Sequence, residues 1–458
     1  MNHLTPSIRS TIRRCLFFTA IALASLSSSV RAADRRPNVL LIMADDMGFE
    51  CLGANGGETY QTPRLDRLAA NGARYRHCHS QPICTPSRVQ IMTGRYNSVN
   101  YLRFGVLDPA AHTFGHLFRD AGYQTVIAGK WQLEGGLDGP RHFGFDRYCL
   151  WQLTRIVGRY PNPGLEIDGR VVDYREGQYG PDVVTDYLCD YFAQHRDEPF
   201  FAYYPMILPH FPFQPTPDSE AWDPSDGVYP KKRWRDEWFV DMVAYTDKMV
   251  GKLVDSLEEL GLRENTLIIF TGDNGTYRGI PSILDGKPYV GGKGSTRDNG
   301  THVPLIVNWP GRVAPGQESD RLVDFTDMLP TIAEVAGLEV PAEWQCQGVS
   351  FAGDFLGSPA QPRHSIYCWY HRDGLRDQAS QHVRTARFKL YGDGRFFDTG
   401  KDPAEEQPLD PDRLDASTRQ LHGRLSAELQ THMRQAAAAD PILQARRREF
   451  VRTVTRQP

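Results

Sequence analysis

The chain has 458 residues, of which 40% are hydrophobic and 24% are charged. These fractions are those of an ordinary globular protein, and they exclude a disordered, collagenous or multi-span membrane protein. The 52 Lys and Arg residues are balanced by 56 Asp and Glu residues, so no excess of positive charge indicates nucleic acid as a partner. The length allows about three domains, or one large α/β domain with a smaller appendage.

The amino-terminal segment, residues 1–32, has the pattern of a secretory signal peptide. A basic start precedes an apolar run over residues 15–26 that is too short to span a bilayer, and Ala32 ends a small-residue motif typical of cleavage. Arg13 and Arg14 are also compatible with a twin-arginine export signal. We therefore expect a periplasmic or secreted protein with no stable membrane anchor.

The eight cysteines are scattered along the chain, and none forms a Cys-x-x-Cys pair. This spacing argues against a zinc site. Cys15 lies within the expected signal peptide, so an odd number of cysteines remains in the exported chain. At least one of them is expected outside a disulfide, and the pairing of the others stays open.

Apolar runs alternate with helical patterns over most of the chain. The runs typical of buried parallel strands cover residues 38–44, 124–128, 200–204, 266–270 and 303–307. Helical periodicity lies at residues 62–71, 183–194, 239–260 and 327–336. Strands that alternate with helices predict an α/β fold built on a large doubly wound sheet flanked by helices.

After about residue 360, the pattern changes to short, turn-linked strands, followed by a helix over residues 416–438. This change indicates a smaller C-terminal α+β subdomain packed on the large domain. The predicted organisation is a signal peptide over residues 1–32, a main domain over residues 33–360 and a subdomain over residues 361–458.

Polar side chains follow the apolar runs, close to the points where the predicted strands end. They are Asp45, Asp46, Lys130, His210, Asp273 and Asn274. Ligands of doubly wound sheets bind outside the carboxyl ends of the strands, so we expect these side chains to converge. Carboxylate and amide oxygens suit Ca²⁺ or Mg²⁺ and disfavour zinc and copper.

The most specific motif is CTPSR at residues 84–88, followed by TGR at residues 93–95. It resembles the C-x-P-S-R…T-G-R signature of type I sulfatases, which are arylsulfatase-like members of the alkaline phosphatase superfamily. Further matches follow in the family's order at residues 45–46, 62–68, 129–131, 209–210, 272–275, 291–294, 303–306 and 309–311. The resemblance implies an alkaline phosphatase-like mixed sheet, with the catalytic domain over residues 33–360.

The resemblance also implies hydrolysis of a sulfate ester with release of inorganic sulfate. In the family the signature cysteine, here Cys84, is oxidised to formylglycine (3-oxoalanine), which requires a formylglycine-generating enzyme as a partner. One hydroxyl of the hydrated aldehyde attacks sulfur, and the second then expels sulfate, a route that a plain serine lacks. The implied metal is Ca²⁺, with Mg²⁺ less favoured. Its implied ligands are Asp45, Asp46, Asp273, Asn274 and an oxygen of the modified Cys84.

The resemblance assigns the remaining catalytic roles to three cationic side chains and one histidine. Arg88 follows Cys84 by four residues, so both can share a helix face, and its implied role is to hold the modified side chain and the charge of the metal site. Lys130 and Lys293 are implied sulfate contacts. His210 is an implied sulfate contact and a candidate proton donor to the leaving group.

One position departs from the family. The family commonly has His after Gly-Lys-Trp, whereas this chain has Gln132, which can hydrogen-bond substrate but accepts no proton at neutral pH. In the family this histidine is a candidate base for the expulsion of sulfate. Our hypothesis is a functional subgroup in which water or a histidine such as His79 acts as the base instead. Residues 299–302 also differ from the family, and we expect Arg297 and His302 to contribute substrate contacts.

The expected substrate is a sulfated glycan, with a small aryl or alkyl sulfate as an open alternative. Arginines at the pocket rim could pair with a carboxylate or second sulfate, and a tryptophan could stack on a sugar. The rim candidates are Arg103, Tyr277, Arg278, Arg297, His302, Trp369, His371 and Arg372. Two other functions stay open, a phosphodiester or phosphonate monoester hydrolase of the same superfamily and an inactive Ca²⁺-dependent glycan-binding homologue.

Overall fold

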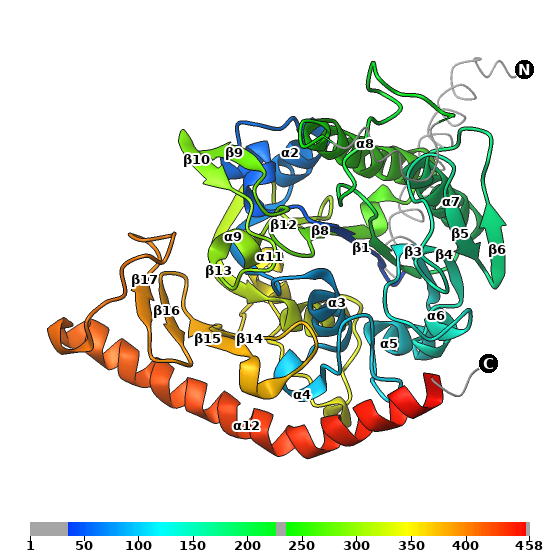
Figure 1. Ribbon diagram of the computed structural model, residues 1–458. Helices are drawn as coiled ribbons and strands as arrows, with labels where there is room; N and C mark the ends of the chain where they lie inside the picture. The colour runs from blue at the N-terminus through cyan, green and yellow to red at the C-terminus, as the bar shows by residue number, and fades with distance from the viewer. Residues whose placement is uncertain (1–34, 226–234, 455–458) are drawn as a thin grey trace, which may run out of the picture.

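The computed structural model describes residues 35–225 and 235–454 (Figure 1). The predicted signal peptide therefore lies outside the described residues. Within the described part, no helix combines the length and the apolar character needed to cross a bilayer.

A large mixed sheet forms the centre of the described structure. Its central strands are β1 (Asn38–Ala44), β7 (Phe200–Pro205), β3 (Gln124–Lys130) and β8 (Thr266–Gly272). β1 pairs in parallel with both β8 and β7, and β7 pairs in parallel with β3. The order of the described 11-stranded sheet is β11-β2-β12-β8-β1-β7-β3-β4-β5-β6, with β13 also paired to β2.

The remaining strands are mostly short. They are β2 (Ala73–His79), β4 (Arg147–Trp151), β5 (Gly164–Ile167), β6 (Arg170–Asp173), β9 (Pro281–Leu284), β10 (Lys287–Val290), β11 (His302–Val303), β12 (Leu305–Asn308), β13 (Gln317–Asp324), β14 (Ile366–Tyr370), β15 (Ser380–Arg384), β16 (Phe388–Tyr391) and β17 (Phe396–Asp398). The helices are α2 (Pro63–Ala70), α3 (Cys84–Thr93), α4 (Asn97–Asn100), α5 (Phe114–Asp120), α6 (Gly139–His142), α7 (Gly180–Gln194), α8 (Trp238–Glu259), α9 (Asp298–Thr301), α10 (Met328–Val335), α11 (Ala352–Leu356) and α12 (Ala416–Val454).

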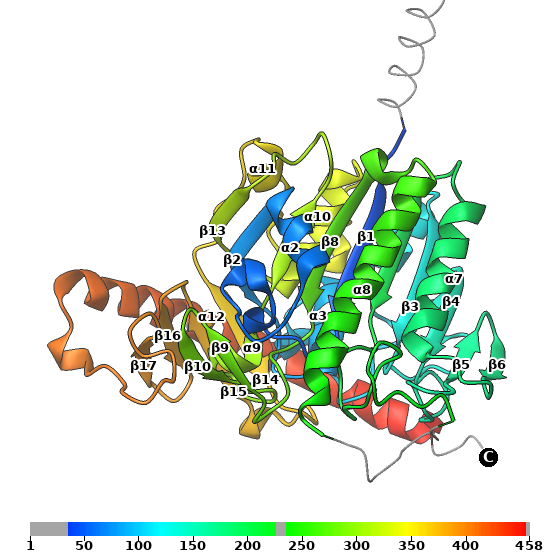
Figure 2. The same cartoon turned by 90° about the horizontal axis from the view of Figure 1, so that it is seen from above.

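Helices cover both faces of the sheet, which explains why its strands are continuously apolar (Figure 2). Alternate residues of β1 point to opposite faces. Leu40 and Ile42 pack in one hydrophobic cluster with residues of α2, α7 and α8, whereas Leu41 and Met43 pack in another with residues of α3, α5 and α10. All of these β1 side chains are fully buried.

The predicted fold class is confirmed, with two differences in detail. The predicted strand over residues 303–307 is interrupted at Pro304, and its two parts, β11 and β12, pair antiparallel to β2. The sequence analysis missed β2 itself. Its sequence, ARYRHCH, alternates buried with partly exposed residues and carries charge, so it lacks the apolar run of the central strands.

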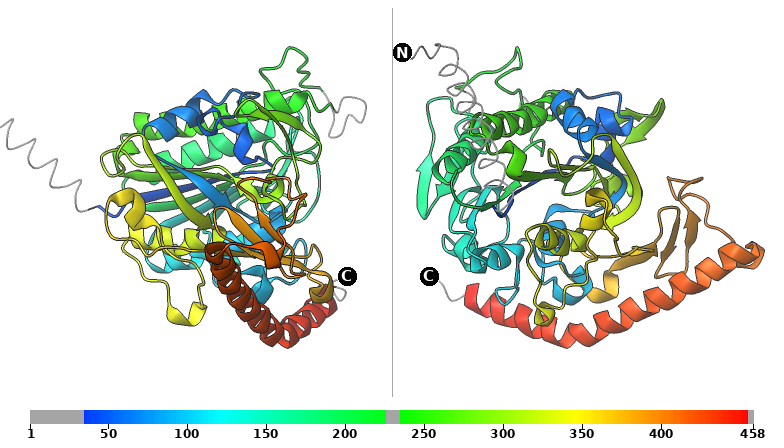
Figure 3. Two further views of the ribbon diagram at one scale, coloured as in Figure 1. Left: turned by 90° about the vertical axis from the view of Figure 1, so that its left-hand side faces the viewer. Right: turned by 180° about the vertical axis from the view of Figure 1, so that it is seen from behind.

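The C-terminal region forms a separate four-stranded antiparallel sheet, β14–β15–β16–β17, as Figure 3 shows. The long helix α12 runs beside this sheet and then along the main body (Figure 1). It extends well beyond the predicted residues 416–438 and contains Pro441. The boundaries that we assign to the two domains stay a prediction.

Candidate active site

The loops after β1 and β8 meet at one edge of the sheet. Ala44 and Gly272 are register partners, so the residues that follow them lie side by side. The Asp46 N–H donates to Asp273 Oδ1 at 3.0 Å, and Asn274 Nδ2 donates to Asp46 Oδ1 at 2.9 Å. Asp46 has a φ of 68°, a left-handed conformation that Asp tolerates better than most residues. The predicted convergence of these side chains is therefore observed.

This edge of the sheet offers a set of oxygen ligands for a hard cation. The side chains of Asp45, Asp46, Asp273 and Asn274 are completely buried. Oδ1 of Asn274 is buried and has no hydrogen-bond partner among the described residues. Ligand atoms of Asp45, Asp273 and Cys84 lie within 4.8 Å of one another. An unpaired amide oxygen beside buried carboxylates fits a divalent cation of the Ca²⁺ or Mg²⁺ type.

Cations surround the carboxylates. Lys130, the last residue of β3, places Nζ 2.8 Å from Asp45 Oδ2 and is itself 1% exposed. Lys293 places Nζ 2.7 Å from Asp46 Oδ2. The neighbouring Lys130 ammonium holds the pKa of Asp45 well below its usual range, although burial acts in the opposite direction. For Asp273, burial and then the nearby Asp45 carboxylate raise the pKa to about 7.

The signature motif begins a helix directly beside these charges. α3 starts at Cys84, as the spacing predicted, and Arg88 follows one turn later. The guanidinium of Arg88 donates to Asp273 Oδ2 at 3.1 Å and to the carbonyl oxygen of Lys130 at 2.9 Å. Ser87 donates to backbone carbonyls of the loop that precedes the helix, which fixes the entry into α3. Cys84 thus occupies the N-terminal turn, where the helix dipole favours negative charge.

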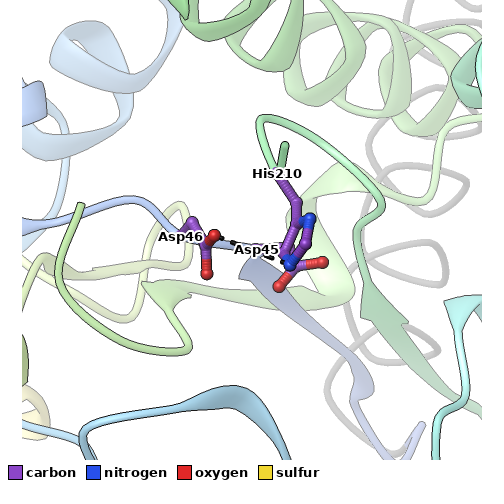
Figure 4. A group of neighbouring side chains, drawn as sticks. All are labelled: Asp45, Asp46 and His210. Carbon is purple, nitrogen blue, oxygen red and sulfur yellow. Dashed lines mark ion pairs between the residues drawn. The ribbon is translucent and has the colours of Figure 1, made fainter. Parts of the chain in front are cut away.

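His210 follows β7, and its ring lies next to the carboxylates of Asp45 and Asp46 (Figure 4). Its Nε2 is 3.1 Å from Lys293 Nζ and 3.6 Å from Asp46 Oδ2. Its Nδ1–H faces the carbonyl oxygen of Phe211. Burial lowers the pKa of His210 to about 3, because the positive charge of Lys293 adds to the loss of hydration and the attraction of Asp46 does not compensate.

Gln132 reaches the residue that follows Cys84. Its Oε1 accepts a hydrogen bond from the Thr85 hydroxyl at 3.1 Å, and its backbone has a φ of 60°. His79, the suggested substitute for the missing family histidine, is buried near a different group, with Nδ1 3.3 Å from Arg384. Burial and then the Arg384 charge hold the pKa of His79 well below its usual value.

Two predicted substrate contacts, His302 and Arg297, make no described contact with the buried carboxylates of this site or with the lysines that pair with them. The His302 ring stacks on Phe49 at a centroid distance of 4.0 Å, and its Nε2–H donates to the carbonyl oxygen of Arg76. Arg297 is exposed and directly precedes α9. Their contact with substrate therefore stays a prediction.

Some of the rim candidates contact neighbours of the cluster. Tyr277 stacks on Phe211, next to His210, and Arg278 contacts the carbonyl oxygen of Lys293. Two cavities of about 800 and 860 Å³ lie along α2 and α8. None of their lining residues belongs to the cluster of carboxylates and cations described above.

The sequence analysis missed one residue near the cluster. Arg159 lies in the loop between β4 and β5, with Nη1 3.2 Å from His210 Nδ1. It belongs to no motif, and only the fold brings it to His210.

The sequence predicts at least one cysteine outside a disulfide. In the described structure seven cysteines are free thiols: Cys51, Cys78, Cys84, Cys149, Cys189, Cys346 and Cys368.

We predict that Arg88→Leu lowers the free energy of unfolding by about 3–5 kcal/mol, because the buried Asp273 carboxylate loses its cationic partner. Urea denaturation of the metal-free protein measures this change. Lys248→Met is the matched control, since Lys248 pairs with Asp218 on the surface and its loss should change stability little. Equal effects of the two substitutions would contradict the structural role of Arg88.

Comparisons with known proteins agree with this arrangement. Residues 37–338 match the sulfatase family model, and residues 293–435 match a model for the C-terminal region of N-sulphoglucosamine sulphohydrolase. Arylsulfatase A of Bos taurus is 31% identical, covering 81% of this chain and 78% of that protein. N-acetylgalactosamine-6-sulfatase of Mus musculus is 29% identical, covering 76% and 71%.

Solved structures show the same fold. The crystal structure of Ps i-CgsB in complex with k-i-k-neocarrahexaose has a TM-score of 0.73 and 26% identity, covering 87% of this chain and 92% of that chain. The family resemblance of the signature motif is thereby confirmed, since the family model matches residues 37–338. The chain belongs to the sulfatase family and is a sulfuric ester hydrolase.

Proposed function

We propose that the chain hydrolyses a sulfate ester of a carbohydrate through formylglycine formed from Cys84, beside a bound divalent cation. The observation that carries this proposal is the position of Cys84. It begins α3, it is 2% exposed, and its sulfur lies among the carboxylates of Asp45 and Asp273. Two similar proteins, an N-acetylgalactosamine-6-sulfatase and a sulfatase-fold protein in complex with neocarrahexaose, support a carbohydrate as substrate.

The residues that would hold the cation are Asp45, Asp46, Asp273 and Asn274, with an oxygen of the modified position 84. Ca²⁺ is the proposed ion, since the donors are all oxygens and most are carboxylates. A bound divalent cation supplies Lewis acidity, which lowers the pKa of a coordinated hydroxyl and makes it a nucleophile at neutral pH.

The protein's own cations then serve the substrate. Lys130 and Lys293 pair with Asp45 and Asp46 in this structure. We assign both ammonium groups to the anionic ester, to which they would donate once a cation neutralises those aspartates. Such fixed donors stabilise the charge that develops in the transition state. Arg88, in contrast, keeps its backbone and carboxylate partners and holds the charge of the site in place.

The remaining roles fall to His210 and to a base that is not Gln132. Nε2 of His210 and Nζ of Lys293 lie 3.1 Å apart, so both reach the same bound group. We assign to His210 the proton transfer to the leaving oxygen. Without a ligand its Nε2 carries no proton, so this role requires that the imidazole becomes protonated when the anionic ester binds. Gln132 positions Thr85 through its amide oxygen. The proton acceptor that restores the aldehyde is proposed to be water or another histidine.

We also propose that the mature protein is periplasmic or secreted and is modified by a formylglycine-generating enzyme. The basis is the amino-terminal pattern and the CTPSR motif at residues 84–88.

The modification itself is testable by peptide mass spectrometry. We predict that the peptide containing Cys84 is lighter by about 18 Da than the unmodified sequence, which is the difference between a thiol and an aldehyde at this residue. Cys84→Ala should abolish turnover, and Cys84→Ser should release at most one equivalent of product, because a serine ester has no second hydroxyl.

The same assay separates the proposed reaction from the superfamily alternative. An aryl sulfate and an aryl phosphodiester are compared side by side on one preparation. Faster turnover of the phosphodiester, or full activity with an unmodified thiol, would contradict the proposed function.

Metal removal gives a further prediction. Chelation should abolish turnover, and Ca²⁺ should restore it. Asn274→Ala should weaken Ca²⁺ binding by about tenfold or more, because the cation loses an oxygen ligand. Calorimetric titration measures this affinity without any turnover, and Asn265→Ala, directly before the first residue of β8, is the control. Unchanged affinity in Asn274→Ala would remove this residue from the metal site.

Gln132→His tests the subgroup hypothesis. We predict that turnover of an aryl sulfate changes by less than about tenfold, because the proton acceptor lies elsewhere in this chain. Gln132→Asn, which accepts no proton, is the matched control. A gain of several orders of magnitude in Gln132→His alone would show that the natural chain merely lacks its base.

A further inference from the structure

Arg159 occupies a defined place beside the proposed sulfate contacts. It lies in the loop after β4, and β4 runs parallel to β3 with Lys130 and Trp151 as register partners. The guanidinium carbon of Arg159 lies 3.9 Å from the centroid of the Trp151 ring. Its Nη1 is 3.2 Å from Nδ1 of His210. The guanidinium is therefore held between the end of the sheet and the proposed proton donor.

The charge of Arg159 has no carboxylate partner in the described part of the chain. The residue is only 8% exposed, and its Nε makes no hydrogen bond to the described residues. Other buried arginines are satisfied differently. Arg88 and Arg384 pair with aspartates, and Arg263 donates to two neutral oxygens. Arg159 differs from all three, because in the described part of the chain it has neither a carboxylate nor an amide or carbonyl oxygen as acceptor. A buried cation with unsatisfied donors is costly, and an anionic ligand would satisfy both the charge and the donors.

His210 does not neutralise this charge. Its Nδ1–H faces the carbonyl oxygen of Phe211, while its Nε2 faces the Lys293 ammonium, which can only donate. In this tautomer Nδ1 has no lone pair for Arg159. In the other tautomer the imidazole would still carry no negative charge. His210 thus supplies no counter-charge to the Arg159 guanidinium.

The loop that carries Arg159 is fixed to the site. The Trp151 indole N–H donates to the carbonyl oxygen of Val157 at 2.8 Å. The Tyr160 hydroxyl donates to backbone carbonyls of Ile207 and His210. The guanidinium is therefore preorganised, which lowers the entropic cost of binding a ligand.

We propose that Arg159 binds a second anionic group of the substrate, a carboxylate or a sulfate, next to the ester sulfate that is cleaved. Arg159 meets the Nδ1 edge of His210, whereas Lys293 and Asp46 meet its Nε2 edge, so the two anionic groups bind on opposite edges of one imidazole. A guanidinium matches either oxyanion with paired donors. The inference rests on the proposed function, since it places the cleaved sulfate at Lys293.

The test is calorimetric titration of the Ca²⁺-loaded full-length protein with arylsulfonates, which mimic sulfate esters but are not hydrolysed. Benzenesulfonate is compared with the 1,2-, 1,3- and 1,4-benzenedisulfonates, and with 3- and 4-sulfobenzoate as the carboxylate arm. We expect at least one doubly anionic probe to bind the natural protein about tenfold or more tightly than benzenesulfonate, the size of a charge-assisted contact.

The decisive quantity is the affinity for the doubly anionic probe divided by the affinity for benzenesulfonate, measured in Arg159→Gln. We expect this ratio to fall to about one, and Arg159→Lys to restore part of it. Arg155→Gln is the matched control, because Arg155 lies on the same loop and pairs with Glu166 and Asp173. Its ratio should equal that of the natural protein.

Two results would overturn the proposal. One is that no second anion improves binding to the natural protein. The other is that Arg159→Gln weakens all probes equally, which would make Arg159 a support for His210 alone. Because the titration needs no turnover, these results stay separate from a failure of the formylglycine proposal, which the mass of the Cys84 peptide reports.

Discussion

The structure depends on one electrostatic constraint, the burial of Asp45, Asp46 and Asp273 at a single edge of the central sheet. Carboxylates removed from water must be neutralised, and desolvation of an unpaired charge would cost several kcal/mol. The fold meets this constraint with cations from separate elements. Lys130 ends β3, Arg88 stands on α3, and each contributes positive charge at hydrogen-bonding distance.

This constraint links stability to chemistry. Under the proposed function, an anionic ester binds the same lysines that pair with the aspartates here, and these lysines change partner when a divalent cation joins the carboxylates. Arg88 is the exception, because its bonds to Asp273 and to the Lys130 carbonyl hold it in place. The strands, packed on both faces by helices, keep these groups at fixed positions, as catalysis by preorganised charge requires.

His210 divides the surroundings of the site into two regions. On its Nε2 edge lie Lys293 and the carboxylate cluster, which form the proposed sulfate site. On its Nδ1 edge lies Arg159, a buried cation whose only described polar contact is this imidazole. The first region is built from residues of the motifs that resemble the sulfatase family, whereas Arg159 in the loop after β4 belongs to none of those motifs. Substrate choice is therefore expected to depend on the second region.

The sequence predicts the central strands, the acidic residues that follow them and the signature helix, because each of these has a local sequence signal. Continuous apolar runs such as residues 38–44 can be buried on both faces only inside a layered sheet, and the acids that follow them must meet at its edge. The CTPSR motif located Cys84 and Arg88 one helical turn apart. Other features depend on long-range packing. These include the pairing of the charged strand β2, the stacking of His302 on Phe49 and the approach of Arg159 to His210. Sequence spacing determines which residues share a strand or a helix turn, whereas contacts between distant loops are decided only when the whole chain packs.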